Sequence, residues 1–221
     1  MLFRSLGPAL AAGNTVVLKP DPHTPWNATR LGRLIVEKTD IPPGVVNVVT
    51  TPSNDVAGLL GTDPRVDLVS FTGSTAVGKL LMRQGADTMK RMFLELGGKS
   101  AAIVLDDANP AVIVPTAIGV CVHAGQACAA TSRMLIHRSL YDQAVADITM
   151  AYQHVPVGDP VDPGTLVGPV ISAAQKERVL SAIDGARRDG AEITVGGGPV
   201  EGLPAYLADG HFVAPTVITG V

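Results

Sequence analysis

The sequence predicts an α/β fold in which short parallel strands alternate with amphipathic helices. Two observations carry this prediction. Along the chain, short runs rich in Val, Ile and Leu are separated by stretches with apolar residues at helical spacing, and Pro or Gly marks many of the changes between them. The composition, 46% hydrophobic but only 4% aromatic, is typical of a folded α/β protein. Such alternation forms parallel sheets with right-handed crossovers.

The first 95 residues are expected to hold four strands and three helices. The strands are short and apolar, as buried parallel strands are, and cover residues 15–19, 45–49, 67–71 and 92–95. The first helix places three apolar residues on one face at helical spacing, namely Leu31, Leu34 and Ile35. Gly44, which follows two prolines, marks the exit from this helix. The three helices cover residues 26–38, 55–60 and 75–84.

The same alternation continues after residue 96. The expected elements are, in order, a strand at 100–104, a mostly helical region at 111–123 despite Pro115, a strand at 133–137, helices at 140–152 and 172–189, and a strand at 212–217. The helix at 140–152 has an apolar face made of Leu140, Ala144, Val145 and Ile148. Two segments rich in Gly or Pro, 156–169 and 196–210, are expected to be surface loops.

Charge and cysteine content exclude several classes of protein. The 17 basic and 20 acidic residues give a net charge of −3 without a basic run, which argues against a nucleic-acid or anionic-membrane partner. No run of 18 apolar residues indicates a membrane span, so a cytoplasmic location is expected. Cys121 and Cys128 do not form a CxxC motif, and the five His residues are scattered, so neither a disulfide framework nor a metal site is expected.

Two segments carry side chains suited to covalent catalysis. The first, LELGGKS at residues 94–100, contains Glu95, and the second, HAGQACAATSR at 123–133, contains Cys128. A thiol that attacks carbon and a carboxylate that takes a proton are the two parts of covalent catalysis followed by hydrolysis. The two residues are too far apart in sequence for local pairing, so the fold must bring them together. Taken alone, each residue also fits a plain role, a solvated Glu and an inert Cys.

Two strand ends could bind a dinucleotide. Residues 71–75 leave a strand and open a helix, so Gly73 permits a tight turn while backbone N–H groups face an anion. The spacing Gly73-x-Thr75-x-x-Gly78 has Thr in place of the middle Gly of the usual fingerprint, and an ordinary Ser or Thr helix cap is the alternative. Lys19 closes the strand TVVLK, where a parallel sheet binds ligands, although a lysine there can also be merely solvated.

Taken together and in this order, the segments resemble the aldehyde dehydrogenase superfamily. Its glutamate motif reads Leu94-Glu95-Leu96-Gly97-Gly98-Lys99 and its cysteine motif Gly125-Gln126-Ala127-Cys128. The resemblance extends over nearly the whole chain, through GPALAAGNTVVLKP, PPGVVNVV, FTGSTAVG, LVGPVISAAQ and FVAPTV. It implies a Rossmann-like parallel sheet in a partial dinucleotide-binding domain at 1–95, followed by part of a second α/β domain, the catalytic one, at 96–221.

The resemblance also implies the reaction. Cys128 attacks a small-molecule aldehyde, hydride passes to NAD or NADP, and Glu95 activates the water that hydrolyses the thioester to a carboxylic acid. Cys121 is expected in the core. The full-length parent would be a homodimer or homotetramer. The residues implied to contact the cofactor are Lys19, Gly73, Ser74, Leu96, Gly97 and Gln175.

Three departures from the family pattern limit these expectations. Pro22 stands where relatives often carry a Glu that holds the ribose 2′-hydroxyl, which leaves NAD and NADP both open, with Asp21 as a substitute acceptor. Pro25-Trp26-Asn27 matches a family signature but follows the wrong strand, so Trp26 is expected to face the core and Asn27 to lie in a first helical turn. The true signature would precede residue 1 and a nicotinamide-ribose segment would follow residue 221. The alternative is therefore an incomplete, inactive fragment that at most binds dinucleotide.

Overall fold

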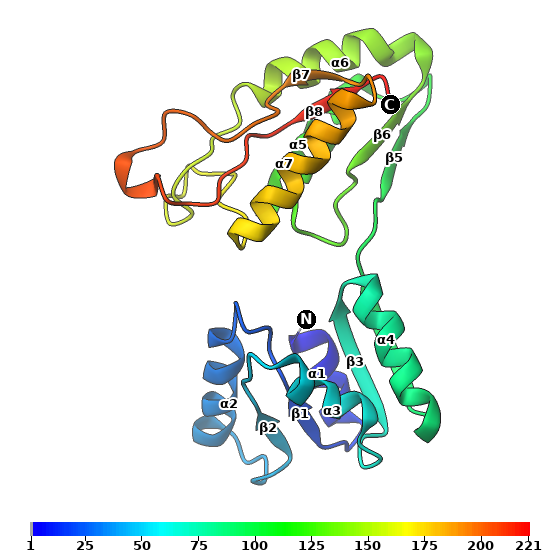
Figure 1. Ribbon diagram of the computed structural model, residues 1–221, viewed down its shortest axis with the longest axis vertical. Helices are drawn as coiled ribbons and strands as arrows, with labels where there is room; N and C mark the ends of the chain where they lie inside the picture. Colours follow the sequence, from blue (N-terminus) through cyan, green and yellow to red (C-terminus); the bar gives the residue numbers. More distant parts are fainter. Residues whose placement is uncertain (1) are drawn as a thin grey trace. The chain divides into compact units, whose positions relative to one another are not determined.

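The computed structural model describes residues 2–221, with side chains from residue 5 onward, and divides them into two compact units (Figure 1). The first unit ends at Gly97 and the second begins at Gly98, two residues beyond the boundary expected from the sequence. Each unit combines strand pairs with helices, so the predicted α/β class is confirmed. The assignment of a cofactor domain and a catalytic domain to these units stays a prediction.

The first unit contains two pairs of parallel strands. β1 pairs with β2, and β3 pairs with β4, each in parallel. The elements are α1 (Leu2–Ala11), β1 (Val16–Leu18), α2 (Trp26–Lys38), β2 (Val46–Val48), α3 (Asn54–Thr62), β3 (Leu68–Gly73), α4 (Thr75–Gly85), the 3-10 turn η1 (Ala86–Thr88) and β4 (Arg91–Leu96). The four strands and three helices predicted from the sequence are all present. The sequence did not predict α1, because Gly7 and Pro8 within it are poor helix formers.

Helix α2 packs on β2 through a narrow stripe. Ala28 and Ile35 are buried on it, and a Cβ added to Gly32 would lie 2.8 Å from Val48 Cγ2, so this glycine lets the helix approach the strand. At 100° per residue, Trp26 lies opposite this stripe and Leu34 lies to one side of it. The prediction that Trp26 faces the core is therefore wrong: its side chain is 83% exposed, and that of Leu34 is 42% exposed.

The second unit has a parallel pair and an antiparallel pair of strands. β5 pairs with β6, and β7 pairs with β8. Its elements are β5 (Ala101–Val104), the 3-10 turn η2 (Pro110–Val112), α5 (Ile113–Ile118), the irregular η3 (Gly119–Gly125), β6 (Arg133–Ile136), α6 (Arg138–Tyr152), α7 (Ala173–Arg188), β7 (Glu192–Val195), η4 (Ala205–Leu207) and β8 (Val217–Thr219). Pro115 is accommodated because it lies in the first turn of α5, where its missing N–H has no helical partner to lose.

The core of the second unit lies around α5 and α6. Ala144 and Ile148 of the predicted apolar face of α6 are buried in it, and Leu140 packs against it. The buried residues of this cluster are Val104, Ile113, Ala117, Cys121, Ala144, Ile148, Tyr152 and Val167. Val167 belongs to the segment at 156–169, which was expected on the surface. This segment folds back through a parallel bridge from Val157 to Val167, so that expectation is wrong at this point.

The strand expected at 212–217 is wrong except at its last residue. β8 begins only at Val217, and its partner β7 was not predicted. Pro215 has no N–H to donate to a ladder, and the Thr216 hydroxyl takes over part of the bonding by accepting from Gly197 N–H and donating to Ala214 O. Phe212, only 2% exposed, anchors this extended segment to the core.

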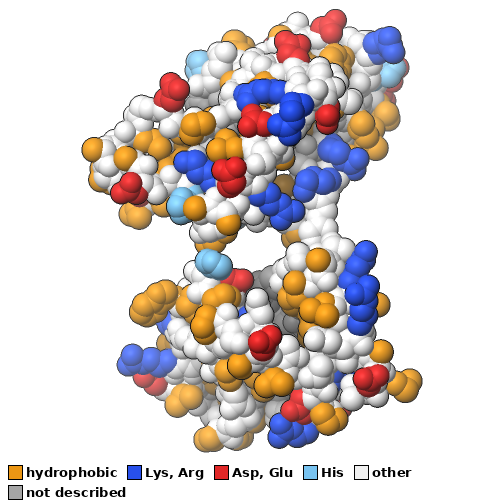
Figure 2. Space-filling model, viewed as in Figure 1, with side chains coloured by type: hydrophobic (Ala, Val, Ile, Leu, Met, Phe, Trp, Pro, Cys, Tyr) orange, Lys and Arg blue, Asp and Glu red, His pale blue; other side chains and the backbone are white. Residues whose placement is uncertain are grey.

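Both units also expose large apolar side chains at the surface (Figure 2). In the first unit these include Val36, Leu59 and Met89, and in the second unit Ile103, Leu135 and Val161. Ile103 on β5 and Leu135 on β6 are partners in the strand register, so one face of this pair is apolar and open. Within the part of the chain that the structure describes, no helix is both long and apolar enough to span a membrane.

Candidate active site

Cys128 lies on an exposed turn after η3, as the sequence predicted. The turn is closed by a hydrogen bond of 3.2 Å from Ala130 N–H to Ala127 O. Among residues 2–221, none accepts a hydrogen bond from the Cys128 N–H. The cysteine is therefore exposed, and its own amide is not engaged by any described residue. This combination suits a nucleophile that also stabilises the oxyanion it creates.

A left-handed stretch of backbone leads the chain into this turn. Val122 is extended, and then His123 (φ 55°), Ala124 (φ 52°) and Gly125 (φ 72°) all adopt positive φ values. Only the glycine does so without steric cost; a non-glycine residue in a sparsely populated backbone region costs about 1–3 kcal/mol. No local sequence pattern predicts positive φ values at His123 and Ala124, although Gly125 is an ordinary marker of such a turn. Strain of this kind next to an exposed cysteine points to a functional loop.

Cys121, by contrast, is part of the core. It is 7% exposed, and its thiol is in hydrogen-bond contact with the Tyr152 hydroxyl, which donates to Ala117 O at 2.7 Å. Burial raises the pKa of the Cys121 thiol above its ordinary value, with the Tyr152 hydroxyl opposing in part. Cys121 therefore stays a neutral thiol at neutral pH. The prediction that it packs in the core is confirmed, and Cys128 is the cysteine open to a substrate.

The carboxyl ends of β3 and β4 bring five of the predicted site residues together. In the parallel register Gly73 is the partner of Leu96, while Thr72 is the partner of Glu95. Ser74 follows Gly73 directly, and Gly97 follows Leu96 as an exposed residue. Glu95 is half-buried at the next-to-last position of β4. This edge of the strand pair is the place where parallel α/β sheets bind ligands.

Ser74 is the N-cap of α4. Its hydroxyl accepts a hydrogen bond of 3.3 Å from Val77 N–H, which is the helix-cap role that the sequence left open. The helix also approaches the end of β4 closely, because a Cβ added to Gly78 would lie 2.8 Å from Leu96 Cδ2. The first turn of α4 retains N–H groups without helical partners, so the cap is compatible with an anion at the same end.

A small hollow lies beside Lys19. It measures about 160 Å³, and its lining residues follow the ends of β1 and β2: Pro20, Pro22, Pro25, Thr50, Thr51 and Pro52. Lys19 itself is half-buried directly after β1. The hollow and Lys19 thus occupy the ligand-binding edge of the first strand pair.

Asp21 next to this hollow is an ionised carboxylate with one oxygen engaged. Its Oδ1 accepts from His23 N–H at 2.9 Å and lies 3.0 Å from His23 Nδ1. Burial acts to raise the pKa of Asp21, but the hydrogen bonds and charge of His23, with the charge of Lys19, outweigh it and lower the pKa below its ordinary value of 3.8. Only Oδ2 remains for a further donor such as a ribose hydroxyl.

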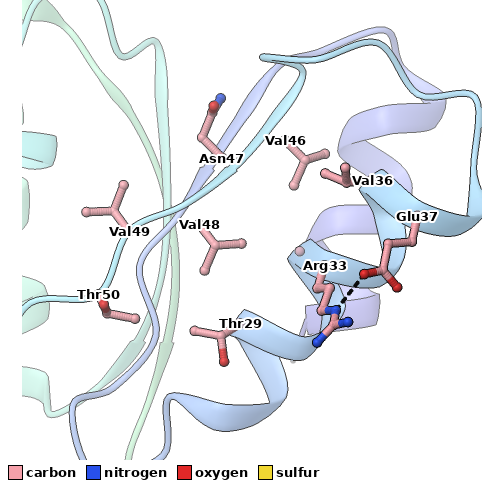
Figure 3. Close-up of a pocket in the computed structure, with 10 residues that line it drawn as sticks. Thr29, Arg33, Val36, Glu37, Val46, Asn47, Val48, Val49 and Thr50 are labelled. Carbon is pink, nitrogen blue, oxygen red and sulfur yellow. Dashed lines mark hydrogen bonds and ion pairs between the residues drawn. The ribbon is translucent and has the colours of Figure 1, made fainter.

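A larger hollow lies between α2 and β2 (Figure 3). It measures about 620 Å³, and its α2 side carries the 2.6 Å ion pair between Arg33 and Glu37. The remaining lining residues are Thr29, Gly32, Val36, Val46, Asn47, Val48, Val49 and Thr50. No residue predicted to bind cofactor or substrate lines it, so we assign it no part in the site.

The second unit brings the Cys128 turn to the start of α7. Gln175, in the first turn of this helix, donates its backbone N–H to the capping hydroxyl of Ser172 at 3.2 Å. Ile171, which directly precedes Ser172, donates its backbone N–H to the side chain of Gln126. Gln126 lies two residues before Cys128. Gln126, a residue to which the sequence assigned no role, therefore links the turn of the predicted nucleophile to the segment just before α7, the helix that carries the predicted cofactor contact Gln175.

The two predicted catalytic residues lie in different units. Glu95 belongs to the first unit and Cys128 to the second, so their meeting stays a prediction. Over the described range, no three His, Cys, Asp or Glu side chains gather as a metal site requires.

This α/β architecture, with an exposed cysteine on one unit and the predicted cofactor contacts at strand ends on the other, has a direct counterpart among known proteins. The model of the aldehyde dehydrogenase family matches residues 1–221. The chain belongs to this family.

Individual relatives resemble the chain over its whole length. Aldehyde dehydrogenase 1A1 of Bos taurus is 40% identical over 223 residues, which cover 100% of this chain and 43% of the relative. 2-Hydroxymuconic semialdehyde dehydrogenase of Pseudomonas putida is 40% identical over 218 residues, covering 98% of this chain and 44% of the relative. The chain thus spans less than half the length of these proteins.

A solved structure shows the same fold. The betaine aldehyde dehydrogenase of Staphylococcus aureus, determined in complex with NAD+, superposes with a TM-score of 0.93 at 36% sequence identity. The match covers 98% of this chain and 42% of that one. The expected fold, a Rossmann-like cofactor domain followed by part of a second α/β domain, is that of these enzymes.

Proposed function

We propose that this chain carries the nucleophile and much of the dinucleotide site of an enzyme that oxidises an aldehyde to a carboxylic acid with NAD or NADP. The observation that carries the proposal is the exposed Cys128, whose backbone N–H no described residue engages, on a turn reached through strained left-handed residues. Membership of the aldehyde dehydrogenase family supports the reaction class.

The residues of this chain have distinct parts in the reaction. The Cys128 thiolate attacks the aldehyde carbon, and the Cys128 N–H donates to the oxyanion that forms. When bound, the dinucleotide accepts the hydride that leaves this carbon. A thioester to Cys128 remains. Glu95 takes a proton from the water that attacks the thioester, so the carboxylic acid departs and the thiol is restored.

We infer that the dinucleotide lies along the ends of the parallel strands. The half-buried Lys19 and the nearby hollow suit an adenosine, and the Ser74 cap with the first turn of α4 suits the phosphates. The proposed contacts are Lys19, Gly73, Ser74, Leu96, Gly97 and Gln175. The Staphylococcus aureus relative was solved with NAD+. Pro22 and the half-engaged Asp21 leave both NAD and NADP as candidates here.

A second function is favoured by one observation. Because the chain spans 43% of the length of its relative from Bos taurus, we also propose that it can bind dinucleotide without turning over aldehyde. The loss of a single oxyanion donor lowers the rate about 10²- to 10³-fold. If residues outside this chain complete the site, the chain alone would therefore show no measurable aldehyde oxidation. A cytoplasmic location and assembly as a homodimer or homotetramer also stay proposals for the full-length protein.

Cofactor reduction tests the proposal. The chain is incubated with an aromatic or an aliphatic aldehyde and either NAD or NADP, and the absorbance of the reduced cofactor is followed. We expect reduction that is abolished in Cys128→Ala and retained in Cys121→Ala, since only the former thiol is exposed. If the chain reduces no cofactor but binds dinucleotide, and a longer chain is active, the second function is supported. Equal rates in the wild type and Cys128→Ala would refute the proposed mechanism.

A further inference from the structure

We propose that Gln126 is a positioning residue that holds the Cys128 turn against the start of helix α7. Its side-chain amide makes two hydrogen bonds at once, one on each side. The donor Nε2 bonds to His123 O at 3.1 Å, and the acceptor Oε1 receives Ile171 N–H at 3.0 Å. The significance of this link for catalysis rests on the proposed function, because it is Cys128 whose position would be fixed.

The first bond closes the left-handed segment. His123 O accepts from the Nε2 of Gln126 and also from its backbone N–H, at 3.1 Å in each case. His123 and Ala124 both have positive φ values, a conformation that persists only where surrounding contacts hold it. The double contact from Gln126 to a single carbonyl is such a constraint, and it fixes the direction in which the chain enters the Cys128 turn.

The second bond anchors that turn to a rigid part of the unit. Ile171 lies 45 residues away in sequence and directly precedes Ser172, the N-cap of α7. The neighbouring Val170 is buried and donates its own N–H to His211 O at 2.9 Å. The point to which Gln126 attaches is therefore held independently by the core.

The two bonds require a side chain with both a donor and an acceptor. A carbonyl can only accept and a backbone N–H can only donate, so the orientation of the Gln126 amide is determined by its partners. A glutamate can keep the bond from Ile171 N–H but cannot donate to His123 O when ionised. An alanine loses both bonds. These differences separate the two halves of the link.

Amide hydrogen exchange by NMR on the full chain tests the proposal. In Gln126→Ala we expect exchange at Ile171 to accelerate about two- to tenfold, the range set by the net contribution of one exposed hydrogen bond. Ala130, whose N–H closes the Cys128 turn, is expected to accelerate with it. Val170, bonded to His211 O, is the internal control and is expected to stay unchanged. Gln126→Glu is expected to restore protection at Ile171.

Two controls separate positioning from general loss of structure. Gln143→Ala removes an exposed side-chain amide that donates to Asp147 on the same helix, and is expected to leave exchange at Ile171, Ala130 and Val170 unchanged. The buried Cys121 thiol should resist alkylation in every variant that remains folded. In the unsubstituted chain, a through-hydrogen-bond coupling between Ile171 N and the Gln126 side-chain carbonyl carbon is also expected, and this measurement requires no variant to fold.

The proposal is overturned if the coupling is absent, or if Gln126→Ala leaves Ile171 and Ala130 as protected as in Gln143→Ala. Acceleration at Ile171 without Ala130 would likewise overturn it, since the link would then not reach the cysteine turn. None of these measurements depends on aldehyde oxidation. Equal rates of aldehyde oxidation in the wild type and Cys128→Ala, together with the expected exchange pattern, would therefore contradict the proposed function and leave the positioning role intact.

Discussion

At the scale of single residues, Tyr152 connects the core to the approach of the cysteine turn. Its hydroxyl donates to Ala117 O in α5 and contacts the thiol of Cys121 in η3. The same segment continues through His123 to Cys128. Two kinds of measurement follow from this buried contact, one on stability and one on pH.

Replacement of Tyr152 by Phe should destabilise the chain. The substitution removes the buried hydrogen bond from the Tyr152 hydroxyl to Ala117 O, which still accepts from Gly119 N–H, and one such hydrogen bond contributes about 0.5–1.5 kcal/mol. Urea unfolding should therefore give a lower free energy of unfolding for Tyr152→Phe. Tyr141→Phe, on the same helix but 37% exposed, is the matched control and should stay within about 0.5 kcal/mol of the wild type. Equal losses in both variants would contradict this role.

Alkaline pH should lower the free energy of unfolding, because Cys121 and Tyr152 ionise. Burial raises the pKa values of Cys121 and Tyr152 above their ordinary values of 9.0 and 10.0, so above about pH 9 the folded chain binds more protons than the unfolded one. Their contribution to stability is complete below about pH 9 and is lost as the pH rises further. Urea midpoints measured from about pH 7 to pH 11 check this. A double variant, Cys121→Ala with Tyr152→Phe, should show a shallower decline; an unchanged slope would rule out this origin.

The sequence predicted the individual site residues better than their surroundings. The burial of Cys121 was predicted and is confirmed, whereas the catalytic role assigned to Cys128 stays a prediction. The positive φ values of His123 and Ala124 and the contact from Gln126 to Ile171 were not predicted. Tertiary contacts across 45 residues impose them, and no local pattern encodes such contacts.

At the scale of elements, α3 and α4 begin in the same way. Ser53 caps α3 and Ser74 caps α4, each with a 3.3 Å hydrogen bond from the N–H group three residues on. Only Ser74 follows a strand end at which we place the cofactor phosphates. The two helices therefore provide a matched comparison between capping alone and capping combined with ligand binding.

Alanine at either cap should cost similar stability but have different effects on binding. Loss of a serine N-cap costs about 0.5–2 kcal/mol, so Ser53→Ala and Ser74→Ala should lower the free energy of unfolding by comparable amounts. Dinucleotide affinity, measured by calorimetry, should fall about tenfold in Ser74→Ala alone, because only this hydroxyl is proposed to reach a phosphate. Equal dinucleotide affinities in the two variants would contradict the phosphate contact and leave Ser74 with a capping role alone.

The elements differ in how well the hydrophobic pattern of the sequence predicts them. The parallel strands β1 to β6 were all predicted, since each is a short apolar run between polar turns. β7 and β8 were not placed correctly, because the bonding there depends on Pro215 and on the Thr216 hydroxyl rather than on a regular ladder. For α2 the helical period of the apolar residues was predicted correctly, but the centre of the buried stripe was not. Gly32 lies at the contact with β2, and a residue without a side chain carries no hydrophobic signal.

At the scale of the whole molecule, the predicted site residues are distributed over two compact units. Lys19, Ser74 and Glu95 belong to the first unit, and Cys128 and Gln175 to the second. Each unit also exposes apolar side chains and two-stranded sheets with open edges. The chain belongs to the aldehyde dehydrogenase family and spans 43% of the length of the Bos taurus relative.

The most direct test of the central claim is to trap the acyl group on Cys128. In Glu95→Gln, incubated with aldehyde and NAD or NADP, we expect a single burst of cofactor reduction and an acyl thioester on the peptide that contains Cys128, detected by mass spectrometry. The unsubstituted chain should turn over without accumulating it. A chain that reduces cofactor without acylation of Cys128, or that becomes acylated at another residue, would contradict the account.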